Sequence, residues 1–260
     1  MSATVIQLEK KANYAVITIN RPDALNALNS TVLNELYETV DQLGKDKSTR
    51  AIILTGQGPK SFVAGADVAV MQNMSENEAA EFAHLGHRTM NAISQSELIS
   101  VAAINGFALG GGLELALACD MRLAADTARL GLPEVTLGLI PGFGGTQRLS
   151  RLVGKGIALE MILGAGMINA ERAYQIGLVN AVHPAADLLS RTADFVERIL
   201  DAKSGQAQRA ARWVVNYGLD QPLPAALAKE VTTFGELFKG TDPKAGITAF
   251  LNKSKAEFES

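Results

Sequence analysis

The stretch from Val101 to Cys119 constrains the fold more than any other part of the chain, because nearly all of its side chains are apolar. Asn105 and Glu114 are its only polar side chains. Gly106 and the triplet 110–112 interrupt it, and a carboxylate inside a bilayer would be costly, so a membrane span is disfavoured. We therefore expect a buried strand followed by a buried helix, both enclosed by a large core.

Size and composition allow one large core or a core with a small appendage, since the chain has 260 residues and 47% of them are hydrophobic. The net charge is −3 without a block of like charges, which argues against a nucleic-acid partner. The single cysteine, Cys119, excludes an internal disulfide and most zinc frameworks, and we expect it in the core. Met1–Val5 does not begin a signal-peptide pattern, so we expect a soluble cytoplasmic protein.

Strands alternate with helices over the first half of the chain, which is typical of an α/β protein. Strands are expected at residues 5–10, 14–19, 51–55, 101–105 and 121–125. A helix opened by Ser30 carries apolar residues at spacings of three and four, and a capping box of Ser75 and Glu78 begins another. Phe82, Leu85, Met90 and Ile93 are expected inside this second helix. Between the helices, a loop is expected from Gly56 to Ala66, and Val68–Met74 has a helix-like pattern.

From about Gly145 the pattern changes to successive helices. They are expected at 145–164, 169–176, 185–200, 204–217, 223–238 and 242–256. Asn169 is expected as an N-cap, Gly177 as a helix stop and Asp242-Pro243 as the start of the last helix. We therefore predict an α/β core over residues 1–190, followed by a C-terminal helical region over 191–260.

Two glutamates in apolar surroundings carry the main chemical signal. Glu114 follows the glycine triplet by one helical turn, and Glu134 follows Pro133 in a second apolar run. Buried carboxylates are rare without a partner or a task, because desolvation of the charge is costly. The pair suggests acid–base chemistry, and the alternative is that each glutamate forms a structural ion pair. The candidate ion-pair partners are Arg122, Arg129 and Arg148.

Two glycine-bearing turns are candidates for binding a developing negative charge. The first N–H groups of a helix that opens at the glycine triplet lack intrahelical partners and can stabilise an oxyanion. The turn from Ser61 to Asp67 can provide a second donor. The alternatives are that the triplet only permits close helix packing, and that residues 61–67 form a plain strand-to-helix loop.

Other candidate sites have weaker support. His84 and His87 lie three residues apart on one expected helix, but no further cluster supports a metal site. The chain lacks a complete dinucleotide fingerprint, a P-loop and the Gly-x-Ser-x-Gly elbow of serine hydrolases. His183 is expected in a loop, and Trp213 is expected to fill a gap in the core or in an interface.

Across nearly its whole length the chain resembles the crotonase (enoyl-CoA hydratase) family. The resemblance is carried by the order and spacing of several segments. These are Asn20–Pro22, Ala24–Ala27, Phe62–Asp67, Asn105-Gly106, Gly110–Glu114, Pro133-Glu134 and Gly138–Leu149. It implies a spiral of ββα units with a C-terminal helical region that serves oligomerisation and active-site closure. Relatives assemble as homotrimers or homohexamers.

The resemblance also implies roles for individual residues. The backbone N–H groups of Ala66 and Gly111 would hold the thioester oxygen, Glu114 would activate a water for attack on C3, and Glu134 would handle the proton that reaches C2. The residues implied to contact the CoA moiety are Ala24, Leu25, Ala27, Ala64, Phe250 and Lys253, the last two from a neighbouring subunit. No cofactor or metal is implied, because CoA is part of the acyl-CoA substrate.

The chain departs from the family pattern at two places. Leu163–Met167 stands where many hydratases have a polar turn, and Phe143 occupies an often small position, which suggests a short-chain acyl pocket. Both glutamates favour enoyl-CoA hydration over double-bond isomerisation, thioester hydrolysis or C–C cleavage on the same scaffold. A non-catalytic or nucleic-acid-binding role is a further alternative. Fatty-acid β-oxidation, butyrate-type metabolism and amino-acid breakdown all fit.

Overall fold

A computed structural model describes residues 4–258 of the chain. Met1 to Ala3 lie outside the described residues. They belong to the segment from which we expected no signal peptide. The chain divides into two compact units between Asp194 and Phe195, whereas the sequence suggested a division at 190/191. Each unit is described by itself below.

Two sheets form the framework of the first unit. The six-stranded sheet has the order β1-β2-β3-β5-β7-β10, and all neighbours are parallel except β1 and β2, which form the expected hairpin. Its strands are β1 (Ile6–Lys10), β2 (Tyr14–Ile19), β3 (Ala51–Gly56), β5 (Ile99–Ile104), β7 (Met121–Ala125) and β10 (Ala181–His183). The second sheet has the order β4-β6-β8-β9. It consists of β4 (Ser61–Ala64), β6 (Phe107–Leu109), β8 (Arg129–Gly131) and β9 (Ile168–Asn169).

The chain passes repeatedly from the large sheet to the small one. β3 leads to β4, β5 leads to β6, and β7 leads to β8, and helical segments follow each pair. Each turn adds one parallel strand to each sheet. This is a spiral of ββα units, so the predicted α/β fold class is confirmed.

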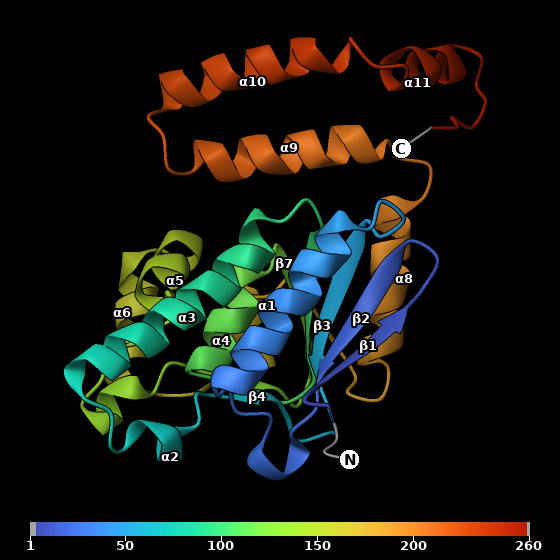
Figure 1. Cartoon of the computed structure of the whole chain (residues 1–260). Coiled ribbons are helices and arrows are strands. Elements are labelled where there is room, and N and C mark those ends of the chain that lie inside the picture. The colour runs from blue at the N-terminus through green and yellow to red at the C-terminus, as the bar shows by residue number, and fades with distance from the viewer. Residues whose placement is uncertain (1–3, 259–260) are drawn as a thin grey trace. The chain divides into compact units, whose positions relative to one another are not determined.

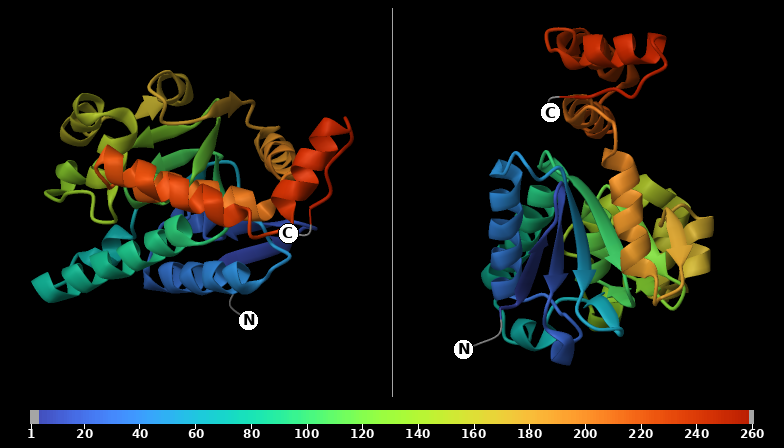
Figure 2. Two further views of the ribbon diagram at one scale, coloured as in Figure 1. Left: turned by 90° about the horizontal axis from the view of Figure 1, so that it is seen from above. Right: turned by 90° about the vertical axis from the view of Figure 1, so that its right-hand side faces the viewer.

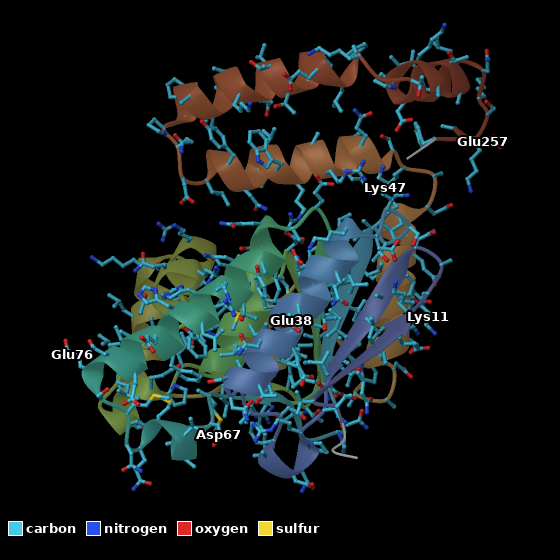
Figure 3. All side chains as sticks on the ribbon, viewed as in Figure 1. Lys11, Glu38, Lys47, Asp67, Glu76 and Glu257 are labelled. Carbon is cyan, nitrogen blue, oxygen red and sulfur yellow. The ribbon has the colours of Figure 1, made fainter. Side chains whose placement is uncertain are left out.

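Helices α1 (Ser30–Lys45) and α3 (Glu76–Gln95) lie side by side (Figures 1 and 2). Leu33, Leu36, Val40 and Leu43 are buried on one stripe of α1, and Glu38 projects from its exposed face (Figure 3). Asn29, rather than Ser30, caps α1, because its side chain accepts the Val32 N–H. The capping box of α3 is confirmed. Leu85 is only half-buried, and Gly86 and Thr89 are buried on that helix instead.

The region from Gly56 to Met74 differs from the prediction. The expected loop contains β4, whose pairing with β6 could not be read from four residues of sequence. The helix-like stretch is the single turn α2 (Val68–Met71). Asp67 precedes this turn (Figure 3), and its carboxylate pairs with Arg21 at 3.1 Å instead of capping α2.

Helix α4 (Gly111–Ala118) is buried along its whole length, as expected for a helix without a polar face. Cys119, directly after it, is also buried. The expected helix at 145–164 is wrong, because Gly154, with φ of +81°, separates α5 (Gly145–Val153) from α6 (Lys155–Gly164). Asn169 caps α7 (Ala170–Gln175) as predicted. His183 belongs to β10, not to a loop.

The second unit is helical. Helix α8 (Leu188–Leu200) spans the division, and α9 (Gly205–Gly218), α10 (Leu223–Leu237) and α11 (Asp242–Leu251) follow. α9 and α10 pack against each other, and a 2.5 Å hydrogen bond joins the Ser204 hydroxyl at the start of α9 to Asp242. α11 ends at Leu251 instead of 256. Trp213 is 46% exposed and stacks on Tyr217, so a place in the core is wrong. No helix in the described part of the chain is long and apolar enough to cross a membrane.

Candidate active site

Three parallel strands of the small sheet end in register and bring the candidate residues together. Ala64 of β4 pairs with Leu109 of β6, and Leu109 pairs with Gly131 of β8. The segments that follow these strand ends contain Ala66, the glycine triplet and Glu134. Because parallel strands leave their carboxyl ends at one edge of a sheet, residues far apart in the sequence meet there.

The two glycine-bearing turns lie against each other. A Cβ atom on Gly110 would be 3.7 Å from the Gly65 Cα, and Gly110 has φ of +50°, which favours glycine. The backbone N–H groups of Ala66 and Gly111 donate to no group of the described chain. Both predicted oxyanion donors therefore lie unpaired at neighbouring turns. The packing alternative holds for Gly112, because a Cβ there would overlap the Val63 carbonyl.

Glu114 is held inside the unit by two backbone amides. Its side chain is 1% exposed, and Oε1 accepts the N–H groups of Phe143 at 2.8 Å and Gly145 at 2.6 Å. Burial raises the pKa of Glu114 to about 7, and the charge of Glu134 adds to the rise, while the two N–H groups and Arg148 oppose it. The structure therefore gives Glu114 a carboxyl that gains and loses protons near neutral pH.

Glu134 has a different environment. It begins the short 3-10 helix η2 (Glu134–Leu137) after Pro133, and its side chain is half-buried. Oε1 points toward Gly110, since a Cβ atom there would be 2.9 Å away, whereas Oε2 is buried without a hydrogen-bond partner in the described chain. Burial raises the pKa of Glu134, and its own backbone N–H opposes the rise. An unpaired buried carboxylate oxygen favours the protonated form or a partner from outside the chain.

The ion-pair alternative does not describe this site. Arg122 donates to backbone carbonyls, among them those of Leu178 and Cys119, and Arg129 donates to those of Thr127 and Ala128. Arg148 donates to the Phe143 carbonyl and to Asn91. Within residues 4–258, none of the three arginines donates a hydrogen bond to Glu114 or Glu134.

Phe143 connects the site to helix α3. Its side chain is 4% exposed, and its ring lies against Gly86, where a Cβ atom would overlap it. The ring also approaches Gly111, with Cδ2 3.2 Å from a Cβ atom placed there, and meets Phe82 edge-on at 5.3 Å between ring centroids. The ring therefore forms a wall beside one candidate oxyanion donor.

The predicted CoA contacts fall into two groups. Ala24 ends the 3-10 helix η1 (Pro22–Ala24), the Leu25 carbonyl accepts the Ala64 N–H at 3.1 Å, and Arg21 donates to the Ala27 carbonyl at 2.6 Å. These four candidate positions thus lie beside the Ala66 turn. Phe250 and Lys253 lie in the second unit, at and just after the end of α11, and both are exposed.

Sequence reasoning overlooked the residues that hold these turns. Asn26 is fully buried, accepts the Arg21 N–H and donates to the carbonyls of Gln57 and Ser61. The available signal in the sequence was an asparagine between apolar residues in the segment 24–27. The amides of Phe143 and Gly145 gave no sequence signal. Among the described residues, no group of three or more His, Cys, Asp or Glu side chains that could hold a metal ion occurs.

Comparisons with known proteins place this geometry in a family context. Residues 9–260 match the family model described as enoyl-CoA hydratase/isomerase. A crotonyl-CoA hydratase from Syntrophomonas wolfei is 48% identical, with 98% of each chain covered. A short-chain-enoyl-CoA hydratase from Clostridium acetobutylicum is 44% identical, covering 99% of this chain and 98% of that protein. The crystal structure of an enoyl-CoA hydratase from Bacillus anthracis matches with a TM-score of 0.94 at 36% identity, over 98% of this chain and 99% of that one.

Proposed function

We propose that this chain, which belongs to the enoyl-CoA hydratase/isomerase family, is a short-chain enoyl-CoA hydratase. It is a hydro-lyase that adds water reversibly to C2=C3 of a trans-2-enoyl-CoA and gives a 3-hydroxyacyl-CoA. One observation carries the proposal: two carboxyl groups with raised pKa values lie beside two unpaired backbone donors. The names of the two relatives support a short acyl chain.

The backbone donors act on the thioester. In a 2-enoyl thioester the double bond is conjugated with the carbonyl, so addition at C3 moves negative charge onto the thioester oxygen. The N–H groups of Ala66 and Gly111 donate hydrogen bonds to that oxygen, and they stabilise the enolate-like charge as it develops. Neither amide gives up an internal hydrogen bond to do so.

The carboxyl groups move the protons. Ionised Glu114 accepts a proton from the water whose oxygen bonds to C3, and its fixed Oε1 leaves Oε2 to face that water. Protonated Glu134 delivers a proton to C2. The two transfers add one water to the substrate and leave Glu114 protonated and Glu134 ionised. A proton returns from Glu114 to Glu134 before the next turnover, and the reverse sequence removes the water. A pKa near the working pH is what both directions require of Glu114.

The remaining parts of the proposal concern binding and assembly. CoA is part of the substrate, so the reaction needs no separate cofactor. Ala24, Leu25, Ala27 and Ala64 hold the CoA moiety, and Phe250 and Lys253 close over it from a neighbouring subunit. The exposed apolar side chains of α10 and its end support a homotrimer or homohexamer. They are Leu227, Val231, Phe234 and Phe238. A cytoplasmic location belongs to the same proposal.

The decisive experiment mixes the purified protein with crotonyl-CoA and follows loss of the conjugated thioester absorbance. Mass and chirality of the product separate the candidate reactions. We expect 3-hydroxybutyryl-CoA of one configuration. A shifted double bond would indicate an isomerase, free CoA would indicate a hydrolase, and either result would overturn the proposed reaction while keeping the family.

A further inference from the structure

Arg148 folds back from the first turn of α5 onto the loop that encloses Glu114. Its Nη1 donates to the Phe143 carbonyl at 3.0 Å, and its Nη2 donates to the Asn91 side chain of α3 at 2.8 Å. The side chain is half-buried. A planar guanidinium with two separate acceptors has a defined orientation, unlike a surface arginine that moves in solvent.

The loop presents its peptide groups on two sides. The N–H groups of Phe143 and Gly145 face the Glu114 carboxylate, and the Phe143 carbonyl between them faces Arg148. Gly144 adopts φ of +106° at this point, a conformation that side-chain-bearing residues rarely adopt. A Cβ atom on Gly144 would also overlap the Arg148 guanidinium. Gly144 therefore allows the peptide groups of the loop to face opposite sides, and Arg148 holds the Phe143 carbonyl on the side away from Glu114.

We propose that Arg148 is a positioning residue for Glu114: it holds the Phe143 carbonyl so that two N–H groups face the carboxylate, and it supplies positive charge beside that carboxylate. The inference rests on the proposed function for the role of Glu114 as the base. The contacts themselves do not depend on the substrate.

The other charged groups near Glu114 leave Arg148 as its positive neighbour. Glu134, on η2, is negative when ionised and raises the pKa of Glu114, whereas Arg148 lowers it. His87, on α3, lies near Gly144, with its Cε1 3.7 Å from a Cβ atom placed there. Burial, then the charge of Arg148, then that of His84 lower the pKa of His87, so its neutral form dominates at pH 7. Arg148 thus offsets part of the burial penalty on the ionised base.

Two readouts test the proposal. The first is the carboxyl titration of Glu114 in ¹³C-labelled protein, with its resonance assigned by loss in Glu114→Gln. The second is the acid limb of the kcat/KM profile for crotonyl-CoA. The variants are Arg148→Met, Arg148→Gln and Arg148→Lys. Arg151→Met is the matched control, because Arg151 lies on α5, is exposed and donates to Gln147.

Arg148→Met and Arg148→Gln are expected to raise the pKa of Glu114 by about one unit, so its ionised fraction at pH 6 falls roughly tenfold. The acid limb moves by the same amount. Arg148→Lys keeps the titration near that of the wild type but lowers kcat/KM, because one ammonium cannot hold both acceptors. Arg151→Met leaves both readouts unchanged.

A Glu114 titration that is equal in Arg148→Met and Arg151→Met would overturn the electrostatic part. Wild-type kcat/KM in Arg148→Lys would overturn the positioning part, and this variant tests the proposal even where the neutral variants do not fold. If the wild-type protein leaves crotonyl-CoA unchanged, the proposed function fails. The titration still decides whether Arg148 acts on Glu114, so the two failures are distinguishable.

Discussion

The two sides of the candidate site use the same residue type in opposite ways. On the Glu114 side, formed by α4 and the loop 143–145, the carboxylate is 1% exposed and two N–H groups hold one oxygen. On the Glu134 side, formed by Pro133 and η2, the carboxyl is half-buried, and one buried oxygen has no partner in the described chain. Two N–H groups from another loop compensate for burial of the charge at Glu114, whereas only the residue's own backbone N–H does so at Glu134.

This difference gives two carboxyls at one sheet edge separate environments, and the roles of base and acid come from the proposed mechanism. Burial raises the pKa of Glu114 to about 7, and the two hydrogen bonds, which favour the ionised form, limit that rise. Burial raises the pKa of Glu134, its Oε2 has no hydrogen-bond partner in the described chain, and only its own backbone N–H favours the anion. Two titratable groups whose environments differ are a common basis for assigning acid and base roles.

The largest expected effect comes from neutralising each carboxyl in turn. Glu114→Gln and Glu134→Gln preserve size, and each should lower kcat for crotonyl-CoA hydration by about 10²–10⁴. The double variant should lose little more, because both groups serve one addition. Stopped-flow absorbance gives the rates, and Glu38→Gln on the exposed face of α1 is the control. Full activity in either single variant would contradict the assignment of Glu114 as base and Glu134 as acid.

The second effect separates the backbone donors from both carboxyls. Gly111 is the first residue of α4, a position that tolerates proline, so Gly111→Pro removes the N–H while keeping the helix start. Gly111→Ala is the matched control, since its Cβ meets the same neighbours, Phe143 and Leu28, but its N–H remains. We expect the proline variant to be about 10²–10³ slower than the alanine variant. Equal rates would remove Gly111 from the oxyanion site.

The elements predicted well from the sequence are those with strong periodicity or continuous burial. β2 and β7 have the predicted bounds, and α1 begins at Ser30 as its apolar spacing indicated. β4, β6, β8 and β9 were not predicted, because strands of two to four residues show no period and depend on pairing for their identity. The ends of three of these strands build the candidate site.

The site was predictable in its residue types but not in its contacts. An acidic residue in the first turn of a glycine-led and otherwise apolar helix pointed to Glu114. Its partners, the amides of Phe143 and Gly145, depend on the left-handed conformation of Gly144, and sequence does not state which way a peptide faces. The sequence also suggested Arg148 as an ion-pair partner, whereas its hydrogen bonds go to a carbonyl and an amide side chain.

The third effect is on the free energy of unfolding, which should depend on pH through the buried carboxyl of Glu114. The pKa of Glu114 rises from 4.5 to about 7 on folding, so the folded state binds its proton more tightly. Stability from this group is therefore full below pH 4.5 and is lost as the pH rises to about 7, with a total on the order of 3 kcal/mol. Urea unfolding of Glu114→Gln should show a gain over wild type at pH 8 that is absent at pH 4.

The same measurement on Glu134→Gln sharpens the comparison. The gain in unfolding free energy of Glu134→Gln over the wild type at pH 8 should be smaller than that of Glu114→Gln. The reason is that the Glu134 side chain is half-buried and water still solvates part of its charge. A larger stability gain from Glu134→Gln than from Glu114→Gln would mean that Glu134, not Glu114, carries the greater cost of burying its charge. An equal stability gain at pH 4 and pH 8 would show that ionisation of the carboxyl is not the cause.

The smallest effect concerns acyl length and the ring that closes the Glu114 side. Phe143→Ala removes the ring but keeps the backbone N–H that Glu114 accepts. We expect kcat/KM for a C8 enoyl-CoA, relative to crotonyl-CoA, to rise by about tenfold or more, within the range that pocket methylenes confer. This ratio compares two substrates on one folded enzyme, so a loss of stability cancels. An unchanged ratio would exclude Phe143 as the wall of a short acyl pocket.

Gly86→Ala shows whether α3 holds that ring in place. The new Cβ would overlap the Phe143 ring, so the ring and the loop 143–145 must shift, and crotonyl-CoA hydration should slow. In the Phe143→Ala background the overlap disappears, and Gly86→Ala should then cost little. The difference between the two backgrounds is the coupling between helix and ring. Equal costs in both would mean that Gly86 serves the helix alone, and that the Glu114 side ends at the loop rather than at α3.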